Sequence, residues 1–484
     1  MKSSLSIILS SLLCSSLFAV ADDEVNASIS SKPLSSEERI GQLEKQLSEL
    51  KSEIASNSET LTEVKKHDAF DNIKFSLDFR NTYDILDYNF KKYSYTDSTG
   101  THDMSGQSAS NDGLFTSRLY LNMKSSPVEN LIFSGQVAMY GVWGGESFGS
   151  FETTSKGWNN SSKADDTLFR LRQAYVIYND SMLDEKLPYT LSIGRRQSTD
   201  GFLANHREGM KEAGSPLGHI TNMEVDGIMG KLDLENYFLP GSFLKLVYGR
   251  AHTGGIETLY DSKGGYQPYA QAEGDTNENV DYLVALGSLY NNGQYNLMFE
   301  NATIFDTKGK NSTTNATAVD AGTANLSALS LQSDGIGEDL GDFLDDTIAF
   351  GSIAMTHYKP SSGHQLLGSS DATKGYSYWA GVVFPDMITE KGKFGLEYNH
   401  GSKYWTPMTW AEDTAMGSKV AVRGNAFEGY WNFNMFGLEN LTGQARYTYA
   451  QHDYTPSIRC SGWVAPQEVD IEASDLRLFV KYIY

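Results

Sequence analysis

The chain has 484 residues and a net charge of −22, from 39 basic and 61 acidic side chains. This balance argues against a nucleic-acid-binding protein, because phosphate contacts require a basic face. The aromatic content of 12% argues against a disordered acidic chain, and two cysteines, Cys14 and Cys460, are too few for a disulfide framework.

Residues 1–21 have the pattern of a secretory signal peptide. Lys2 supplies the positive start, a short apolar stretch follows, and Ala19-Val20-Ala21 is a small-x-small cleavage site. After residue 21 there is no run of 18 apolar residues, so no transmembrane helix is expected. We therefore expect an exported protein that can cross a membrane only as a β-barrel.

Residues 22–70 are expected to form a periplasmic linker and a short coiled coil. Ser35 and Glu38 have the spacing of a capping box at a helix start. The heptad core positions that follow are Ile40, Leu43, Leu47, Leu50, Ile54, Asn57, Leu61 and Val64. This stripe requires a partner, either other copies of itself, with a homotrimer favoured, or the body of the protein.

From residue 71 onward the hydrophobic period changes to two, which predicts strands. Between Ile73 and Arg80, for example, apolar side chains alternate with Lys74, Ser76, Asp78 and Arg80. Fifteen such segments are apparent, among them Lys419–Phe433. Short connections alternate with long ones, as in outer-membrane barrels. An even strand number requires one more strand between Phe305 and Asp346, and Val319–Gln332 is the best candidate. The expected fold is all-β, a transmembrane antiparallel barrel of about 16 strands over residues 71–484.

Charged residues at inward positions are candidates for the lining of a pore. They are Arg80, Arg118, Arg170, Arg172, Arg196, Arg446, Arg477, Asp78, Glu300, Glu397 and Glu428. One interpretation is a constriction whose arginines, with Arg170 and Arg172 foremost, give a weak anion preference. The other is that these charges pair across strands and only stabilise the wall. The aromatic stretches Tyr376–Trp379, Tyr404-Trp405 and Tyr430-Trp431 are expected in the girdles at the membrane interfaces.

No catalytic, cofactor or metal site is expected. The nine histidines show no metal-binding spacing. One Gly-x-Ser-x-Gly match, residues 145–149, opens a polar loop, whereas a nucleophile elbow requires a strand-to-helix turn. We therefore predict that the protein is not an enzyme.

Three stretches carry a resemblance to a known family: Asp78-Phe79-Arg80 with Tyr83-Asp84, residues 119–123 (LYLNM) and residues 395–405 (GLEYNHGSKYW). With the signal peptide and coiled coil, they resemble an uncharacterised porin-like outer-membrane β-barrel family of epsilonproteobacteria. The resemblance implies an outer-membrane barrel and no known substrate. In such a host, Asn26 in Glu24-Val-Asn-Ala-Ser28 matches a periplasmic glycosylation acceptor.

Two functions remain open. The first is a porin-like channel in the outer membrane of a Gram-negative bacterium, for passive diffusion of small hydrophilic solutes or ions. The second is a non-conducting anchor whose coiled coil binds a periplasmic partner or whose loops bind an outside surface. Either one implies contact with outer-membrane lipid and lipopolysaccharide, and insertion by the barrel assembly machinery.

Overall fold

The computed structural model describes residues 73–97, 99–143, 168–252, 279–337, 341–389, 391–457 and 464–484, together with Lys45, Leu47, Leu50 and Lys51. The signal peptide, Asn26, both cysteines and the other coiled-coil positions lie outside the described residues. Leu47 and Leu50 are helical and exposed. The chain divides into two units, residues 1–69 and 70–484.

The second unit is a closed antiparallel β-barrel. Its wall contains every strand of the 17-stranded sheet except the two-residue β21, which leaves 16. The wall strands are β1 (Lys74–Lys92), β4 (Gln107–Val128), β5 (Leu131–Val142), β6 (Leu168–Met182), β7 (Leu187–Ser198), β10 (Thr221–Asp233), β11 (Phe243–His252), β12 (Val280–Asn291), β13 (Tyr295–Ile304), β16 (Gly322–Asp334), β17 (Ile348–Pro360), β19 (Thr373–Pro385), β20 (Lys393–Gly401), β22 (Gly424–Asn434), β23 (Leu441–Tyr454) and β24 (Glu468–Ile483).

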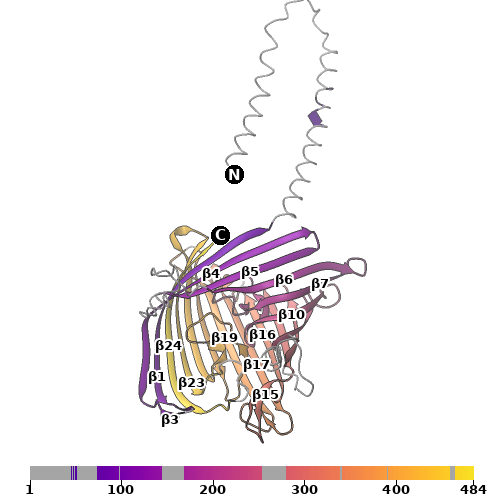
Figure 1. Cartoon of the computed structure of the whole chain (residues 1–484). Coiled ribbons are helices and arrows are strands. Elements are labelled where there is room, and N and C mark those ends of the chain that lie inside the picture. Colours follow the sequence, from indigo (N-terminus) through magenta and orange to yellow (C-terminus); the bar gives the residue numbers. More distant parts are fainter. Residues whose placement is uncertain are drawn as a thin grey trace, which may run out of the picture. The chain divides into compact units, whose positions relative to one another are not determined.

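Each wall strand pairs with its neighbours in chain order, and β24 pairs with β1 to close the sheet. In Figure 1 the closing pair is the indigo β1 beside the yellow β24. The predicted strand between Phe305 and Asp346 is present as β16, and it pairs with β13 and β17. The expected 16-strand barrel is therefore confirmed.

The connections hold the remaining short elements. They are β2 (Ser94–Asp97), β3 (Gly100–Asp103), β8 (Gly201–Phe202), β9 (Gly214–Leu217), β14 (Lys308–Asn311), β15 (Thr317–Asp320), β18 (His364–Gln365), β21 (Met408–Thr409), α4 (Asp342–Asp345), η2 (Lys419–Ala421) and η3 (Met435–Gly437). No helix among the described residues is long and apolar enough to span a membrane.

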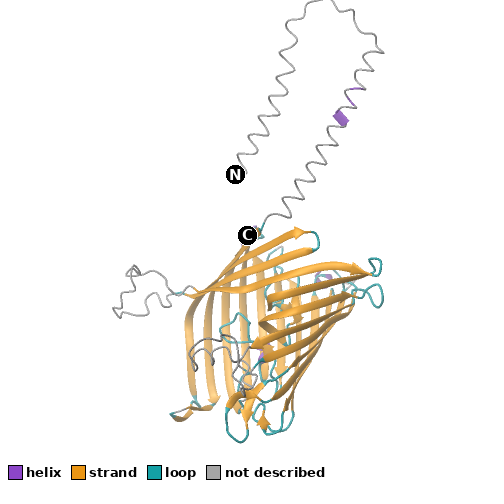
Figure 2. Ribbon diagram, turned by 45° about the vertical axis from the view of Figure 1, so that its right-hand side comes forward, coloured by secondary structure: helices purple, strands orange, loops and turns teal. Residues whose placement is uncertain are grey.

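Long connections alternate with short ones along the chain, so the barrel has two different ends. We call them the long-loop end and the short-turn end. β12 and β13, for example, are joined by residues 292–294, whereas β7 and β10 are joined by residues 199–220. Figure 2 shows the wall as a single layer of strands between these two sets of connections.

The outer face of the wall is apolar. Alternate residues of each strand face outward, and large apolar side chains among them are exposed, such as Ile193, Ile228, Ile353, Leu396 and Phe427. Charge-free apolar side chains in such numbers are suited to contact with lipid rather than water. The alternation in the sequence therefore has the expected origin, one lipid-facing side and one interior side of each strand.

Two long connections enter the barrel instead of remaining at its end. We call residues 199–220 the first inner segment and residues 402–423 the second inner segment. In the first, His219 shares hydrogen bonds of 2.8 Å with Ser352 of β17 and Ser377 of β19. In the second, β21 pairs in parallel with Thr221 and Asn222 at the start of β10.

The two inner segments form a hydrophobic core inside the barrel. Phe202, Leu203, Leu217, Ile220 and Trp405 are buried in it. They pack against inward side chains of the wall between β12 and β22, which are Tyr282, Leu286, Met298, Ala302, Ile304, Ala324, Leu326, Ala328, Ile348, Phe350, Ala354, Tyr358, Trp379, Val383 and Tyr430. The prediction that these aromatic residues lie in the interfacial girdles is therefore wrong for Trp379, Trp405 and Tyr430. Burial of large aromatic side chains is also favourable inside the lumen.

Candidate functional site in the charged half of the lumen

Four arginines line the inner face of four adjacent wall strands. Arg446 of β23 lies directly opposite Arg477 of β24, and Arg80 of β1 lies directly opposite Arg118 of β4. Like charges placed opposite one another across a ladder destabilise a sheet. This arrangement therefore requires acidic side chains close by.

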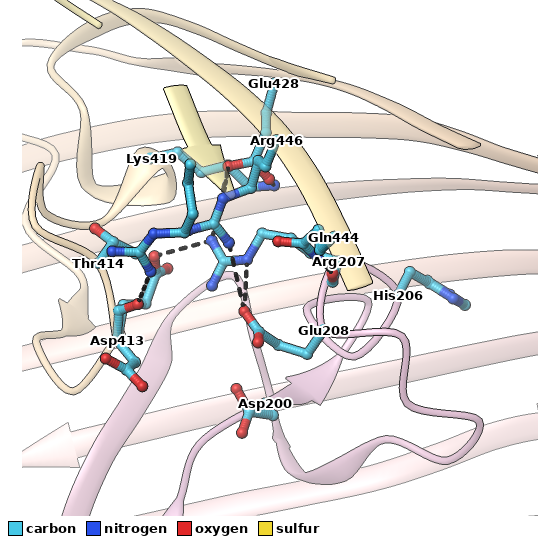
Figure 3. A network of polar contacts seen from close by, with 12 residues as sticks. Asp200, His206, Arg207, Glu208, Asp413, Thr414, Lys419, Glu428, Gln444 and Arg446 are labelled. Atoms are coloured by element: carbon cyan, nitrogen blue, oxygen red, sulfur yellow. Dashed lines mark hydrogen bonds and ion pairs between the residues drawn. The ribbon is translucent and has the colours of Figure 1, made fainter. Parts of the chain in front are cut away.

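The inner segments supply some of these acidic side chains. Asp413 of the second inner segment accepts a hydrogen bond from Arg80 and another of 2.9 Å from Arg118. Glu208 of the first inner segment has one carboxylate oxygen 3.6 Å from Nη1 of Arg80 and the other 3.5 Å from Nη1 of Arg446. Figure 3 shows Glu208 and Asp413 within a group of polar side chains that includes Arg207 and Arg446. Each acid thus bridges guanidinium groups of different strands.

The wall supplies the remaining acid. Arg477 donates from Nε and Nη2 to the two oxygens of Asp84 at 2.5 and 3.0 Å, a bidentate pair. Arg118 donates to both oxygens of Asp78 at 3.1 Å. These bonds fix the guanidinium planes, so the arginines do not move freely in the lumen.

A more deeply buried group of charges fastens the inner segments to the wall. Lys419 of η2 lies 2.5 Å from Glu397 of β20 and also contacts Glu428 of β22. Arg207 of the first inner segment lies 3.1 Å from Glu412 of the second. All five side chains are almost fully buried. Because buried charges are tolerated only when paired, this group holds both segments in one position.

The electrostatic surroundings keep Asp413 and Glu208 of the inner segments ionised. Enclosure in the lumen would raise the pKa of Asp413, but the guanidiniums of Arg80, Arg118 and Arg477 outweigh that effect and lower it to about 2. Burial acts in the same way on Glu208, and positive neighbours led by Arg207 lower its pKa as well. Both carboxylates are therefore anionic at neutral pH.

The site divides into a buried part and a part that faces water. Arg80 and Arg118 expose 3% and 12% of their side chains, whereas Asp78 and Asp413 expose 21% and 37%. The acids therefore present more charge to the lumen than the arginines with which they pair. The arrangement can set the field along a water-filled path, and it offers no nucleophile with an adjacent base. Among the described residues, no cluster of three or more His, Cys, Asp or Glu could hold a metal.

The other predicted residues lie elsewhere along the interior. Arg172 donates to Glu224, Gln136 and Thr199 at a bulge of β6 and is buried. Arg170 pairs with Ala138 and is exposed, and no hydrogen bond or ion pair of its side chain is found within the described ranges. Arg170 and Arg172 therefore share no partner. Arg196 packs over the ring of Tyr175, with 4.6 Å from its guanidinium carbon to the ring centroid.

Glu300 and Glu397 lie beneath the inner segments. Glu300 accepts hydrogen bonds from the Leu217 amide at 2.6 Å and from the Thr221 hydroxyl at 2.7 Å. Glu397 accepts a hydrogen bond of 2.8 Å from Nε1 of Trp379. Both carboxylates are buried, so they anchor the inner segments and contact little lumen water.

Sequence reasoning missed the inner-segment charges that join this site, among them Arg207, Glu208, Glu412, Asp413 and Lys419. These segments have no period of two or 3.6, so their sequence does not indicate which side chains enter the lumen. Asp84 was missed for another reason. β1 continues to Lys92, whereas the alternation was followed only as far as Arg80. Continuing the alternation along β1 would have predicted that the side chain of Asp84 points inward.

The fold resembles solved outer-membrane proteins at low sequence identity. OmpT of Vibrio cholerae is 12% identical, with 85% of this chain and 97% of that chain covered and a TM-score of 0.44. An anion-selective porin from Comamonas acidovorans is 11% identical, with 85% and 99% covered and a TM-score of 0.45. The outer-membrane channel DcaP of Acinetobacter baumannii is 12% identical, with 85% and 97% covered and a TM-score of 0.43.

The comparison with curated proteins gives no match. A family profile, however, matches residues 108–480, which is most of the barrel. The chain therefore belongs to the family described as protein of unknown function DUF3373.

Proposed function

We propose that the protein is a channel in the outer membrane of a Gram-negative bacterium, for passive diffusion of small hydrophilic solutes or ions. A barrel of 16 strands is wide enough to enclose an aqueous path. The observation that carries the proposal is the division of the lumen. The inner segments pack on the apolar side and reach the arginines of the opposite side through Glu208 and Asp413, where Asp413 remains 37% exposed.

The exposure of the charged groups favours a weak cation preference, the reverse of the preference expected from the arginine count. Every arginine of the four-strand group is paired with an acid, and the water-facing members are mainly Asp78 and Asp413. Glu224, the partner of Arg172, is exposed as well. Fixed charge in a narrow, low-dielectric path acts at short range with little screening. Exposed carboxylates therefore outweigh buried guanidiniums.

Planar-bilayer recording of the purified, folded protein tests the proposal. We expect stepwise conductance. Across a salt gradient, we expect a reversal potential whose sign indicates a preference for cations. Silent bilayers with protein that is folded by circular dichroism would favour the anchor function. In that case the inner segments would close the lumen, and the coiled coil or the loops would carry the function.

We further propose that the heptad segment associates with other copies, with a trimer favoured. Leu47 and Leu50 are helical and exposed in a single chain, as core positions awaiting a partner would be. Native mass measurement of the Leu47→Glu/Leu50→Glu variant tests this. A smaller assembly with an intact barrel is expected, and an unchanged assembly would assign association to the barrel. Lipid, lipopolysaccharide and the barrel assembly machinery remain proposed partners of the wall.

A further inference from the structure

A row of aromatic rings extends along β1 to the tip of the hairpin that joins β1 to β4. The ring centroids of Tyr88 and Phe90 lie 6.3 Å apart, those of Phe90 and Tyr93 5.6 Å, and those of Tyr93 and Tyr95 6.0 Å. At the tip, Tyr95 of β2 stacks on His102 of β3, with 5.0 Å between the centroids. In Figure 1 β3 lies just beyond the end of β1. Each ring thus contacts the next, and we call these five residues the aromatic strip.

The aromatic strip continues the inner face of the wall. Asp84 and Leu86 are buried on the inner side of β1, and Tyr88 and Phe90 follow at the same parity. A register shift comes directly after Phe90, and the ring contacts keep the strip on the same side beyond it. The connection between β4 and β5 is short, so this hairpin belongs to the long-loop end. The strip therefore leads from the long-loop end toward the charged half of the lumen.

The rings of the strip cover little of one another. From Tyr88 to Tyr95, neighbouring ring planes lie within 10–28° of parallel. Stacked planes approach to about 3.5 Å, so near-parallel rings with centroids about 6 Å apart are displaced sideways and overlap only at their margins. Tyr95 is 39% exposed, and the three rings below it are half-buried. Ring faces carry negative charge density, which attracts cations.

Carboxylate charge is in excess where the strip meets the lumen. Asp475 of β24 lies directly opposite Leu86, one inward position from Tyr88. Asp475 and Asp84 share the guanidinium of Arg477, whose Nε lies 2.5 Å from Asp84 and 4.0 Å from Asp475. Two carboxylates thus flank one guanidinium. In a region of low dielectric, their field favours an approaching cation.

The lysines of the hairpin lie on its other face. Lys91 and Lys92 pair with Glu472 and Glu468, at 2.6 and 3.0 Å. In β24 these two acids occupy the positions that alternate with buried, inward Ile471. The charge of both lysines is therefore compensated on the side away from the strip, and it does not oppose a cation on the rings.

From this geometry we infer that the aromatic strip binds organic cations, which are solutes that carry an ammonium group on an apolar or aromatic body. The rings contact the apolar body and the cation together, and the carboxylates below Tyr88 attract the charge inward. A row of similar rings offers several weak sites in succession, as passage into a channel requires. As the entrance of a channel, the strip rests on the proposed function. As a binding surface, it does not require conduction.

Calorimetric titration of the folded, full-length protein in an uncharged detergent tests the strip with two probes. Benzyltrimethylammonium carries the cation, and benzenesulfonate has a ring of the same size with the opposite charge. The native chain is compared with two variants that keep apolar bulk and remove rings, Tyr88→Leu/Phe90→Leu and Tyr93→Leu/Tyr95→Leu.

The matched control removes an aromatic pair from the outer face of the same two strands. Tyr83 of β1 lies directly opposite Phe115 of β4, with ring centroids 4.6 Å apart. Tyr83 alternates with buried Thr82 and Asp84, so its ring points away from the lumen. Tyr83→Leu/Phe115→Leu therefore makes the same chemical change and leaves the strip intact.

Each strip variant should bind benzyltrimethylammonium about three- to tenfold more weakly, because two cation–π contacts are lost. The control should bind within about twofold of the native chain. Tyr93→Phe/Tyr95→Phe keeps the rings and should bind as the native chain does. Tyr95→Leu alone changes the hairpin tip and no wall strand, so its loss of about twofold is measurable even if a double variant folds poorly.

Four outcomes would overturn the inference. They are no binding of benzyltrimethylammonium by the native chain, unchanged binding in the strip variants, an equal loss in the control, and equal binding of benzenesulfonate. Silent bilayers would count against the channel alone, because calorimetry measures binding to the strip without conduction.

Discussion

The barrel interior has two halves of opposite character. Between β12 and β19, inward side chains are mainly apolar or small, and the inner segments cover them. From β22 through β24, β1 and β4, inward side chains are mainly charged and hydrogen-bonded. The first half resembles the core of a soluble protein enclosed by strands, and the second resembles the wall of an aqueous path. The inner segments thus pack on one side of the lumen through apolar side chains and contact the other side through charged and polar groups such as Glu208 and Asp413.

The largest expected effect comes from the apolar half. Trp405 is fully buried and donates from Nε1 to the Val420 carbonyl at 2.7 Å. Trp405→Ala should destabilise the second inner segment by about 3–5 kcal/mol through lost burial and a cavity. Limited proteolysis should then cut within residues 402–423, and conductance should rise. Leu396→Ala, on the outer face of β20, is the control and should leave both properties unchanged. A protected segment in Trp405→Ala would contradict the role given to the internal core.

A somewhat smaller effect is expected where the two halves meet. Lys419→Met removes the ammonium 2.5 Å from buried Glu397, while Glu428 keeps Arg207 and Arg446 at 3.9 Å. This costs about 3–5 kcal/mol before Glu397 relieves it by taking up a proton. Thermal unfolding should show the loss. Lys92→Met breaks an exposed pair with Glu468 and should cost less than about 1 kcal/mol. Equal shifts in the two variants would mean that burial of the Lys419 group adds nothing.

Acid should loosen the apolar half before the charged half. Burial lowers the pKa of His219 to about 3, below the unfolded value of about 6.5. The unfolded segment therefore binds more protons, and folding loses about 1.4 kcal/mol per pH unit from about pH 6.5 down to about pH 3. Asp413, with a pKa lowered to about 2, stabilises its segment above its unfolded value of about 3.9 and loses that contribution only as pH falls through 2.

Hydrogen exchange of residues 199–220 between pH 7 and pH 5 checks this order. The contribution of His219 to the protection of this segment should be lost as pH falls. In His219→Gln, whose amide can still bond Ser352 and Ser377, the pH dependence should be weaker in this window. The same slope in both proteins would assign the acid response to another group.

The smallest expected effect concerns ion preference in the charged half. Asp413→Asn removes a water-facing carboxylate and should shift the reversal potential toward anions by a few millivolts, as expected for one partly screened charge. Asp184→Asn, at the turn between β6 and β7, is the control. A shift toward cations would contradict the weight given to the exposed carboxylates in the ion preference.

The two halves also differ in how far the sequence predicts them. In the charged half the alternation is strong, because inward Asp475, Arg477 and Lys481 of β24 alternate with outward Leu476, Leu478 and Val480. In the apolar half, inward Ala324, Leu326 and Ala328 of β16 are as apolar as their outward neighbours Leu329 and Leu331. The sequence therefore indicated this strand only through the requirement for an even number of strands.

The charged site was predictable only where it belongs to the wall. Inward parity identified Arg80, Arg118, Arg446 and Arg477, because a strand fixes the direction of each side chain. It did not identify Glu208 or Asp413, because their positions depend on packing of irregular segments against residues more than 100 positions away. The expected strand Lys419–Phe433 likewise begins too early, since η2 turns Lys419 into the lumen.

The apolar inner face of β12 to β19 has a consequence for biogenesis. In an ordinary porin wall, only alternate residues must be shielded from water before insertion. Here nascent β16 and β17 expose apolar groups on both faces, which makes them prone to aggregate during transit through an aqueous compartment. Because the inner segments supply the cover for one face, their docking should accompany closure of the wall, so lumen filling and membrane insertion become one coupled step.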